Sequence, residues 1–189
     1  LRDLKISVIL GTPEQRLKAL EADAQIYVTN RDNIVWLRNQ KWPVYMFDTI
    51  VLDELSSFKN WNAARTKAVN RLCRQAKRVI GLTGTPASNG LMDLWSEIGV
   101  LDGGERLGPS LKWYQQKYFI PKTWYRDHVK TWDLKPGADQ AIYSAIEDMT
   151  ISMKAMDHLQ MPEKIVTNYK VYLSEPERRQ YETLTQEMS

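Results

Sequence analysis

Two short apolar runs, each ending in a polar cluster, constrain the fold of this chain most. Thr49–Leu52 reads TIVL and is followed by Asp53-Glu54, and Arg78–Leu82 reads RVIGL and is followed by Thr83-Gly84-Thr85-Pro86. A continuous apolar run of this length is typical of a strand buried on both faces, as in a parallel sheet. We therefore expect a sheet whose strands end in these two polar clusters.

Strands and helices alternate along the first hundred residues. The expected strands are Leu4–Leu10, Ile26–Val28, Thr49–Leu52 and Arg78–Leu82. One expected helix starts at Thr12, which forms a capping-box pattern with Gln15. The further expected helices are one capped by Asn30 and running through Asn39, Asn60–Ala76 and Leu91–Val100. This order indicates an α/β fold in which a parallel sheet is flanked by helices.

The pattern changes after Gly108 and predicts a helical C-terminal extension. The expected elements are a helix over Ser110–Phe119, a loop over Ile120–Asp133, an amphipathic helix over Ala138–Leu159, a half-exposed strand over Lys164–Leu173, and a final helix after the capping box Ser174-Glu175-Pro176-Glu177. We thus expect an α/β lobe over 1–108, a helical and aromatic extension over 109–163, and a connecting segment over 164–189.

Composition excludes several classes of protein. The chain has 189 residues, 43% hydrophobic and 26% charged, which is typical of about one globular domain. No apolar stretch is long enough for a transmembrane helix, so we expect no membrane association. The single cysteine, Cys73, excludes an internal disulfide and fits a reducing, cytoplasmic setting, while His128 and His158 are too few for a histidine-built metal site.

Positive charge is concentrated in one segment although the net charge is only +3. Between Leu55 and Met92 there are seven lysines and arginines and no acidic residue. The segment predicts a basic face that binds a polyanion such as nucleic acid, and Arg65, Arg71 and Arg74 are the candidate contacts. The alternative is a solvated helix face that happens to be basic.

The two polar clusters are the candidate catalytic residues. Asp53 and Glu54 follow a strand, and ligands of open α/β sheets bind at that edge. Adjacent carboxylates there suit a bound Mg²⁺ and an attacking water. Taken alone, an acidic pair at a strand end or a Thr-Gly-Thr-Pro turn is more often structural, but their conjunction across a basic helix is a stronger signal.

These residues resemble a known family. Val51–Asn60 resembles motif II of the superfamily 2 helicases, and its tail, Lys59-Asn60, resembles the Swi/Snf-type DNA translocases. Gly81–Asn89 resembles motif III of that branch, and Tyr27–Asn30 is similar, more loosely, to its motif Ib. The compact spacing is most similar to phage or prophage members. The resemblance covers nearly the whole chain and implies a first RecA-like lobe.

The sequence departs from the family pattern in two respects. It contains no Gly-x-x-x-x-Gly-Lys-Ser/Thr loop, which binds the phosphates in the family, and the second lobe is absent. We therefore expect that the chain is a truncated lobe that neither binds ATP tightly nor hydrolyses it alone. Many relatives have histidine where this chain has Ser56, and we expect the serine hydroxyl to bond to motif III instead.

The resemblance implies a mechanism for a longer protein: hydrolysis of ATP with Mg²⁺, coupled to stepping along nucleic acid, with DNA as the expected partner. By resemblance, Asp53 holds the metal and Glu54 activates water. The expected coupling residues are Thr83, Gly84 and Thr85, and the expected contacts to backbone phosphates are Thr29, Asn30 and Lys59. The second lobe of the same parent chain is an expected partner.

Two other functions remain open from the residues alone: a nucleic-acid-binding module without catalysis, and a metal-dependent phosphohydrolase such as a nuclease.

In the family the strand with the phosphate loop lies beside the strand that ends in Asp53. Without that strand we expect either a rearrangement of the remaining strands or a second copy that covers the gap. Trp113, Trp124 and Trp132 could stack on bases, although packing under a loop is the favoured interpretation.

Overall fold

The computed structural model describes residues 4–40, 47–88, 90–126, 128–153 and 167–187. It divides into two compact units, Leu1–Thr150 and Ile151–Ser189, which are treated separately below. Asn89, His158 and the parts of the expected helix and strand between 154 and 166 lie outside the described residues. Among the helices that are described, none is both long and apolar enough to cross a membrane.

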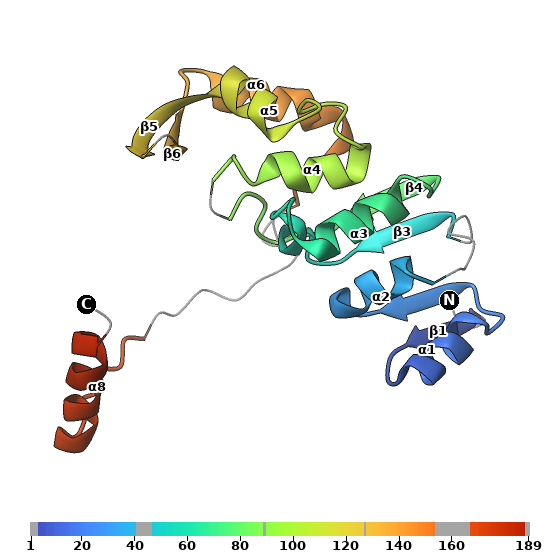
Figure 1. Ribbon diagram of the computed structural model, residues 1–189, viewed down its shortest axis with the longest axis horizontal. Coiled ribbons are helices and arrows are strands. Elements are labelled where there is room, and N and C mark those ends of the chain that lie inside the picture. The colour runs from blue at the N-terminus through green and yellow to red at the C-terminus, as the bar shows by residue number, and fades with distance from the viewer. Residues whose placement is uncertain (1–3, 41–46, 89, 127, 154–166, 188–189) are drawn as a thin grey trace. The chain divides into compact units, whose positions relative to one another are not determined.

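Two small parallel sheets form the first half of unit one (Figure 1). Strand β1 (Ile6–Ile9) pairs with β2 (Ile26–Thr29), and β3 (Thr49–Leu52) pairs with β4 (Arg78–Gly81). This confirms the predicted α/β class with parallel strands. The expected single sheet is, however, present as two pieces, and no strand pairing within the described ranges joins them.

Helices follow the strands, as the alternation predicts. They are α1 (Pro13–Leu20), α2 (Ile34–Arg38) after a 3-10 turn at Arg31–Asn33, α3 (Ala64–Cys73) and α4 (Leu94–Asp102). The capping box is confirmed: the Thr12 N–H donates to Gln15 Oε1 at 2.8 Å, and the Gln15 N–H donates to Thr12 Oγ1 at 3.4 Å. Asn30 caps the 3-10 turn by accepting the Asn33 N–H at 3.1 Å.

The residues that the structure describes cover the β3–β4 sheet on one face only. Leu52 is 5% exposed and packs with residues of α2, α3 and α4, whereas Val51 is 56% exposed. The expectation that Thr49–Leu52 is buried on both faces is therefore wrong for the described residues. Ile80 and Leu82 of the neighbouring segment are also exposed, so this sheet presents an uncovered apolar face.

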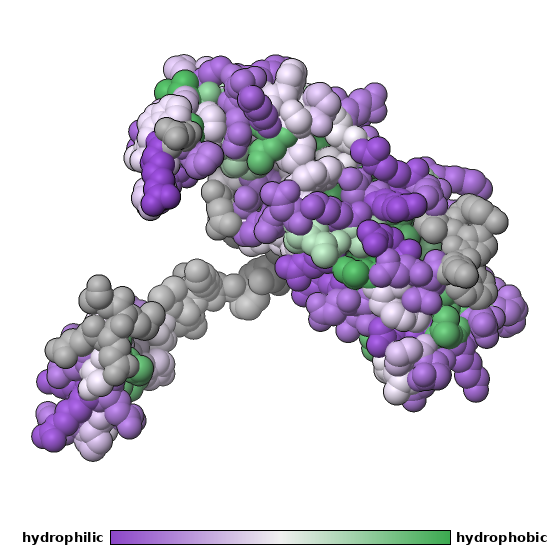
Figure 2. All heavy atoms as spheres, in the orientation of Figure 1, coloured by the Kyte–Doolittle hydropathy of each residue, from purple (hydrophilic) through white to green (hydrophobic). Residues whose placement is uncertain are grey.

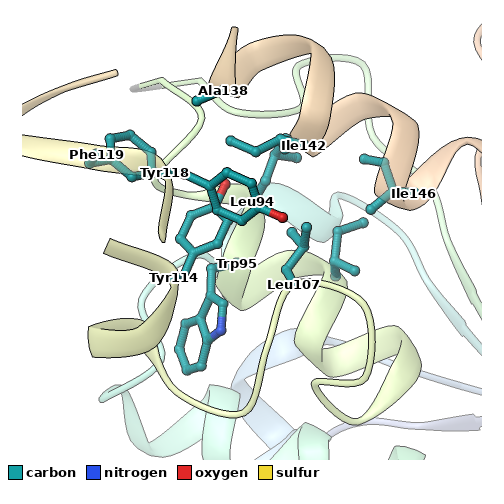
Figure 3. Close-up of a cluster of buried hydrophobic side chains, with 10 residues drawn as sticks. Leu94, Trp95, Leu107, Tyr114, Tyr118, Phe119, Ala138, Ile142 and Ile146 are labelled. Carbon is teal, nitrogen blue, oxygen red and sulfur yellow. The ribbon is translucent and has the colours of Figure 1, made fainter. Parts of the chain in front are cut away.

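A second core lies between α4, α5 (Leu111–Tyr118) and α6 (Ala138–Ile146) (Figure 3). The rings of Tyr114 and Tyr118 meet edge to face at 5.2 Å. Trp61 packs against both cores, and its ring lies 4.8 Å from that of Trp95. The two cores therefore meet at Trp61 and α4.

An antiparallel hairpin replaces the loop predicted over Ile120–Asp133. It consists of β5 (Phe119–Tyr125) and β6 (His128–Leu134). The segment is rich in threonine and aromatic residues, which favour strands, but interspersed charges obscure the pattern. Cross-strand contacts stabilise it: the Thr123 and Thr131 hydroxyls lie 2.6 Å apart, and Lys122 pairs with Asp133 at 3.0 Å.

The prediction of one long helix over Ala138–Leu159 is wrong. Helix α6 ends at Ile146 and is followed by a 3-10 turn at Glu147–Met149. The Thr150 hydroxyl donates to the Ile146 carbonyl at 2.9 Å, which satisfies a free carbonyl at the helix end. Ile151–Met153 is not helical.

Unit two contains α8 (Glu175–Glu187), which begins where the sequence predicts. Glu177 accepts hydrogen bonds from the Ser174 N–H at 2.9 Å and from its hydroxyl at 2.7 Å. The strand predicted over Lys164–Leu173 is not formed over 167–173. Its alternating pattern has no partner strand among the described residues, and a strand needs a paired neighbour.

Candidate functional site

The two polar clusters meet at one edge of the β3–β4 sheet. Leu52 is in register with Gly81, so Asp53-Glu54 and Thr83–Thr85 emerge from adjacent parallel strand ends. The backbone joins the two segments beyond the strands, because the Leu55 N–H donates to the Leu82 carbonyl at 2.8 Å. The structure thus brings together the residues predicted for catalysis and coupling.

Glu54 has an unusual backbone. Its φ of 54° and ψ of 60° place it in the left-handed region, which is costly for a residue with a side chain. The Glu54 carbonyl accepts the Ser57 hydroxyl at 2.7 Å, and its N–H donates to Asp53 Oδ1 at 3.1 Å. These contacts fix the Glu54 backbone and the Asp53 carboxylate at the exposed end of β3.

The Asp53 carboxylate fits a magnesium ligand. It is exposed, and among the described residues Oδ1 receives only the Glu54 N–H. Mg²⁺ prefers oxygen ligands and commonly takes one or two carboxylates together with water and substrate phosphates. Within the described ranges no three His, Cys, Asp or Glu side chains cluster as ligands. The chain therefore fits Mg²⁺ through one carboxylate, while its sequence offers no phosphate loop for ATP.

Gly81 and Gly84, the two glycines at and before the coupling residues Thr83–Thr85, have different surroundings. At Gly84 an added Cβ would meet nothing within 4 Å and the backbone angle is not left-handed, so neither space nor backbone conformation requires glycine there. At Gly81 an added Cβ would lie 2.7 Å from Leu55 Cδ2. Close packing at the end of β4 therefore favours glycine at Gly81, because a Cβ there would displace the Leu55 side chain, and sequence reasoning missed this.

Lys59 makes the side-chain link between motif II and motif III. Its Nζ donates to Ser88 Oγ at 2.9 Å and lies 3.7 Å from Asp93 Oδ2. The expected bond from Ser56 to motif III is not made, since the Ser56 hydroxyl is directed to Glu54 Oε2 at 3.5 Å. The lysine side chain is longer and charged, so it reaches the motif III loop, whereas the serine side chain does not.

Glu97 is a buried acid that the sequence analysis overlooked. It is 1% exposed, and neither carboxylate oxygen has a hydrogen-bond partner among the described residues. Burial, and then the charge of Asp93, raises the pKa of Glu97 to about 7, while Lys59 opposes the shift. The sequence signal was present, because Glu97 lies three residues after Leu94 and so shares its buried stripe on α4.

The predicted basic face lies on the outer side of α3. Arg65 and Arg71 are exposed and make no ion pair with a described residue, whereas Arg74 donates to the Gly103 carbonyl at 3.4 Å. Lys77 pairs with Asp48 at 2.7 Å. Figure 2 shows a mainly hydrophilic surface over this part of the unit. The charge of α3 is therefore accessible and largely uncompensated.

Thr29 and Asn30 lie in the other sheet, at the end of β2. The Thr29 hydroxyl donates to the Ile9 carbonyl at 3.0 Å, and Asn30 acts as a helix cap. Both side chains therefore stabilise local structure. Their predicted phosphate contacts stay a prediction.

Comparisons with known proteins agree with this geometry. The SNF2-related domain family matches residues 2–189. "Putative protein p41" of Acyrthosiphon pisum secondary endosymbiont phage 1 is 30% identical over 100% of this chain and 42% of its own length. The helicase-like transcription factor of Mus musculus is 32% identical over 82% of this chain and 14% of its own. The chain thus spans less than half the length of these relatives.

A solved structure shares the fold. The "Sulfolobus solfataricus SWI2/SNF2 ATPase core in complex with dsDNA" has a TM-score of 0.56 and 25% identity, over 78% of this chain and 28% of that one. The family match and this neighbour favour a helicase-like ATPase domain over a nuclease. The chain belongs to the SNF2-related domain family and corresponds to the first lobe of its ATPase core.

Proposed function

We propose that this chain supplies the water-activating and coupling residues of an ATP-dependent DNA translocase. The observation that carries the proposal is the meeting of Asp53-Glu54 with Thr83–Thr85 at adjacent strand ends, closed by the Leu55–Leu82 backbone bond. Carboxylates at this edge of a parallel sheet are suited to metal and water. The family match supports an ATPase as the setting in which they act.

Each carboxylate has its own proposed role. Asp53 would hold Mg²⁺, which when bound neutralises phosphate charge. Glu54 orients the attacking water and accepts its proton. The left-handed backbone of Glu54 and the hydrogen bond from the Ser57 hydroxyl to its carbonyl support this role, because they fix the Glu54 backbone directly after Asp53 at the end of β3.

Coupling to DNA is proposed to pass through motif III. Thr83 and Thr85 lie next to the acidic pair, and the Thr85 N–H donates to the Thr83 hydroxyl at 3.2 Å. Lys59 connects motif II to Ser88 beyond this turn. A change at the acidic pair would therefore reach the loop after β4 through both a backbone and a side-chain link.

DNA is the proposed partner, contacted through phosphates. Arg65, Arg71 and Arg74 of α3 are the proposed main contacts, with Thr29, Asn30 and Lys59 as further ones. Phosphate contacts provide affinity without reading sequence. The SWI2/SNF2 ATPase core that shares the fold was solved in complex with dsDNA, which supports duplex DNA as the partner here.

The 189-residue chain by itself is proposed to be inactive on ATP, because no phosphate-binding loop is present in its sequence. The remaining nucleotide contacts would come from other residues of a longer protein, including a second lobe, acting in the cytoplasm. Calorimetric titration of this chain with Mg²⁺ and ATP should show no binding, and micromolar affinity would contradict this part of the proposal.

The decisive experiment uses the full-length protein that contains this chain. Duplex DNA should stimulate its ATP hydrolysis, and Glu54→Gln should nearly abolish turnover while ATP binding persists. Glu21→Gln, which changes an exposed carboxylate at the end of α1, is the matched control and should retain full activity. Normal turnover in Glu54→Gln would remove Glu54 from the mechanism.

A further inference from the structure

The tip of the β5–β6 hairpin presents two large aromatic rings to solvent. Trp124 is 63% and Tyr125 is 62% exposed. Consecutive strand residues point to opposite faces, so the two rings flank the ribbon on both sides. Aromatic rings usually bury most of their surface, so this exposed pair leaves ring faces available to a ligand.

The base of the hairpin is firmly held. Phe119 is buried in the core of α4–α6, and Trp132 packs against the same cluster. Lys135, directly after β6, donates its N–H to the Tyr118 carbonyl at 3.0 Å, and its ammonium group donates to the Gln116 and Lys117 carbonyls. The exposed tip is thus presented by a fixed support.

Positive charge surrounds the rings. From Leu111 to Lys135 the sequence has six lysines and arginines and two aspartates. Asp133 is paired with Lys122, whereas Lys112 and Lys130 make no ion pair with a described residue. The Arg126 guanidinium lies 5.5 Å from the centre of the Tyr125 ring. The surface therefore combines ring faces with accessible cations.

A groove beside the hairpin adds hydrogen-bonding groups. It measures about 520 Å³, lies between α5 and β6, and is lined by Lys112, Gln115, Gln116, His128, Val129 and Trp132. Side-chain amides donate to and accept from base edges, and Trp132 offers an aromatic wall. The groove is large enough to receive one base with its sugar.

We propose that the hairpin and α5 bind an unpaired DNA strand. Trp124 and Tyr125 each stack on a base, one on either side of the ribbon, while Lys112, Arg126 and Lys130 contact phosphates and the α5–β6 groove receives one base. Bases inside a duplex have both faces covered by neighbours, so stacking selects unpaired bases. The proposal rests on the proposed function only for the polymer being DNA, and it adds a contact for single strands remote from the basic helix α3.

The test measures binding of the 189-residue chain to a fluorescein-labelled single-stranded oligonucleotide and to the same sequence as a duplex. Trp124→Ala with Tyr125→Ala should weaken single-strand binding about tenfold or more and leave duplex binding within about twofold, because stacking contributes this much per base. Tyr143→Ala with Tyr181→Ala, which removes two other exposed rings, should change neither.

Two further readouts locate the contact. Trp124→Phe with Tyr125→Phe keeps the rings and should restore single-strand binding to within about threefold of the original. An oligonucleotide with 5-iodouracil should crosslink at the hairpin tip, as mapped by mass spectrometry. Unchanged single-strand binding in the alanine variant, or an equal loss for duplex, would overturn the proposal. Either result would leave Glu54-dependent turnover untouched, so failure here is distinct from failure of the proposed function.

Discussion

The ammonium nitrogen of Lys59 lies 2.9 Å from the hydroxyl oxygen of Ser88, which joins the end of motif II to the loop after β4. The same nitrogen lies 3.7 Å from a carboxylate oxygen of Asp93, at the start of α4. The Lys59 side chain therefore connects the segment that follows β3 with the loop that follows β4. It also reaches the start of α4, the helix that packs against both cores.

This link predicts a coupling defect when either end is removed. Lys59→Met and Ser88→Ala should each lower DNA-stimulated ATP turnover of the full-length protein roughly threefold to thirtyfold, with turnover in the absence of DNA retained. The physical reason is that the loop after β4 loses its side-chain tie to motif II. Steady-state ATPase assays with and without duplex DNA measure this, and Lys18→Met on α1 is the control.

The same two variants separate a structural tie from a phosphate contact. If Lys59 also binds a phosphate, Lys59→Met lowers the slope of log affinity against log salt by about 0.9, while Ser88→Ala does not. A slope unchanged in Lys59→Met would remove Lys59 from the predicted phosphate contacts. Equal DNA stimulation in wild type and both variants would show that the link does not couple.

The basic helix predicts salt-sensitive binding to duplex DNA. Arg65→Glu, Arg71→Glu and Arg74→Glu together should abolish measurable binding at moderate salt, because each phosphate contact contributes about 0.9 to the salt slope. Fluorescence anisotropy across a salt series checks this. Lys18→Glu, Lys170→Glu and Arg178→Glu make the same change in net charge away from α3 and should have little effect. If the triple α3 variant binds duplex DNA like wild type, the basic face does not contact DNA and is only a solvated helix face.

Local signals in the sequence predicted local structure well. The capping box at Thr12, the Asn30 cap and the helix start after Ser174 form as expected, because each depends on atoms within a few residues. The parallel pairing of β3 with β4 also agrees with the parallel sheet that the apolar runs indicate. These signals were sufficient to place the acidic pair beside motif III.

Features that depend on distant packing were missed. The hairpin is stabilised by cross-strand pairs such as Thr123–Thr131, which a pattern along one strand does not reveal. The end of α6 and the unpaired segment around Val171 depend on which neighbours are available. Lys59 acquires its environment from Ser88 and Asp93, and Glu97 acquires its own from burial and from the charges of Asp93 and Lys59.

The open face of the β3–β4 sheet predicts self-association of the 189-residue chain. Val51, Ile80 and Leu82 are 56%, 39% and 50% exposed, and burying apolar surface releases roughly 25 cal/mol per Å². Sedimentation should show dimers or larger species at high concentration. Val51→Thr with Leu82→Thr should shift the chain toward monomer, whereas Leu184→Thr on α8 should not. A wild-type chain that stays monomeric at every concentration would show that a second copy does not cover the exposed face of the β3–β4 sheet.

Glu97 predicts a stability that falls as pH rises. The folded carboxyl has a pKa of about 7, above its ordinary value of 4.5, because it is buried without a hydrogen-bond partner among the described residues. Folding therefore takes up a proton between these values. The contribution of Glu97 to stability is fully present below about pH 4.5 and is lost as pH rises through 7.

Replacing the acid should remove this loss. Glu97→Gln cannot ionise, so relative to wild type it should gain up to roughly 3 kcal/mol in free energy of unfolding between pH 5 and pH 8.5. Urea unfolding at the two pH values measures the gain, and Glu21→Gln, an exposed carboxylate, should show no comparable change. A difference between Glu97→Gln and wild type that is the same at both pH values would mean that Glu97 is already ionised in the folded chain at low pH.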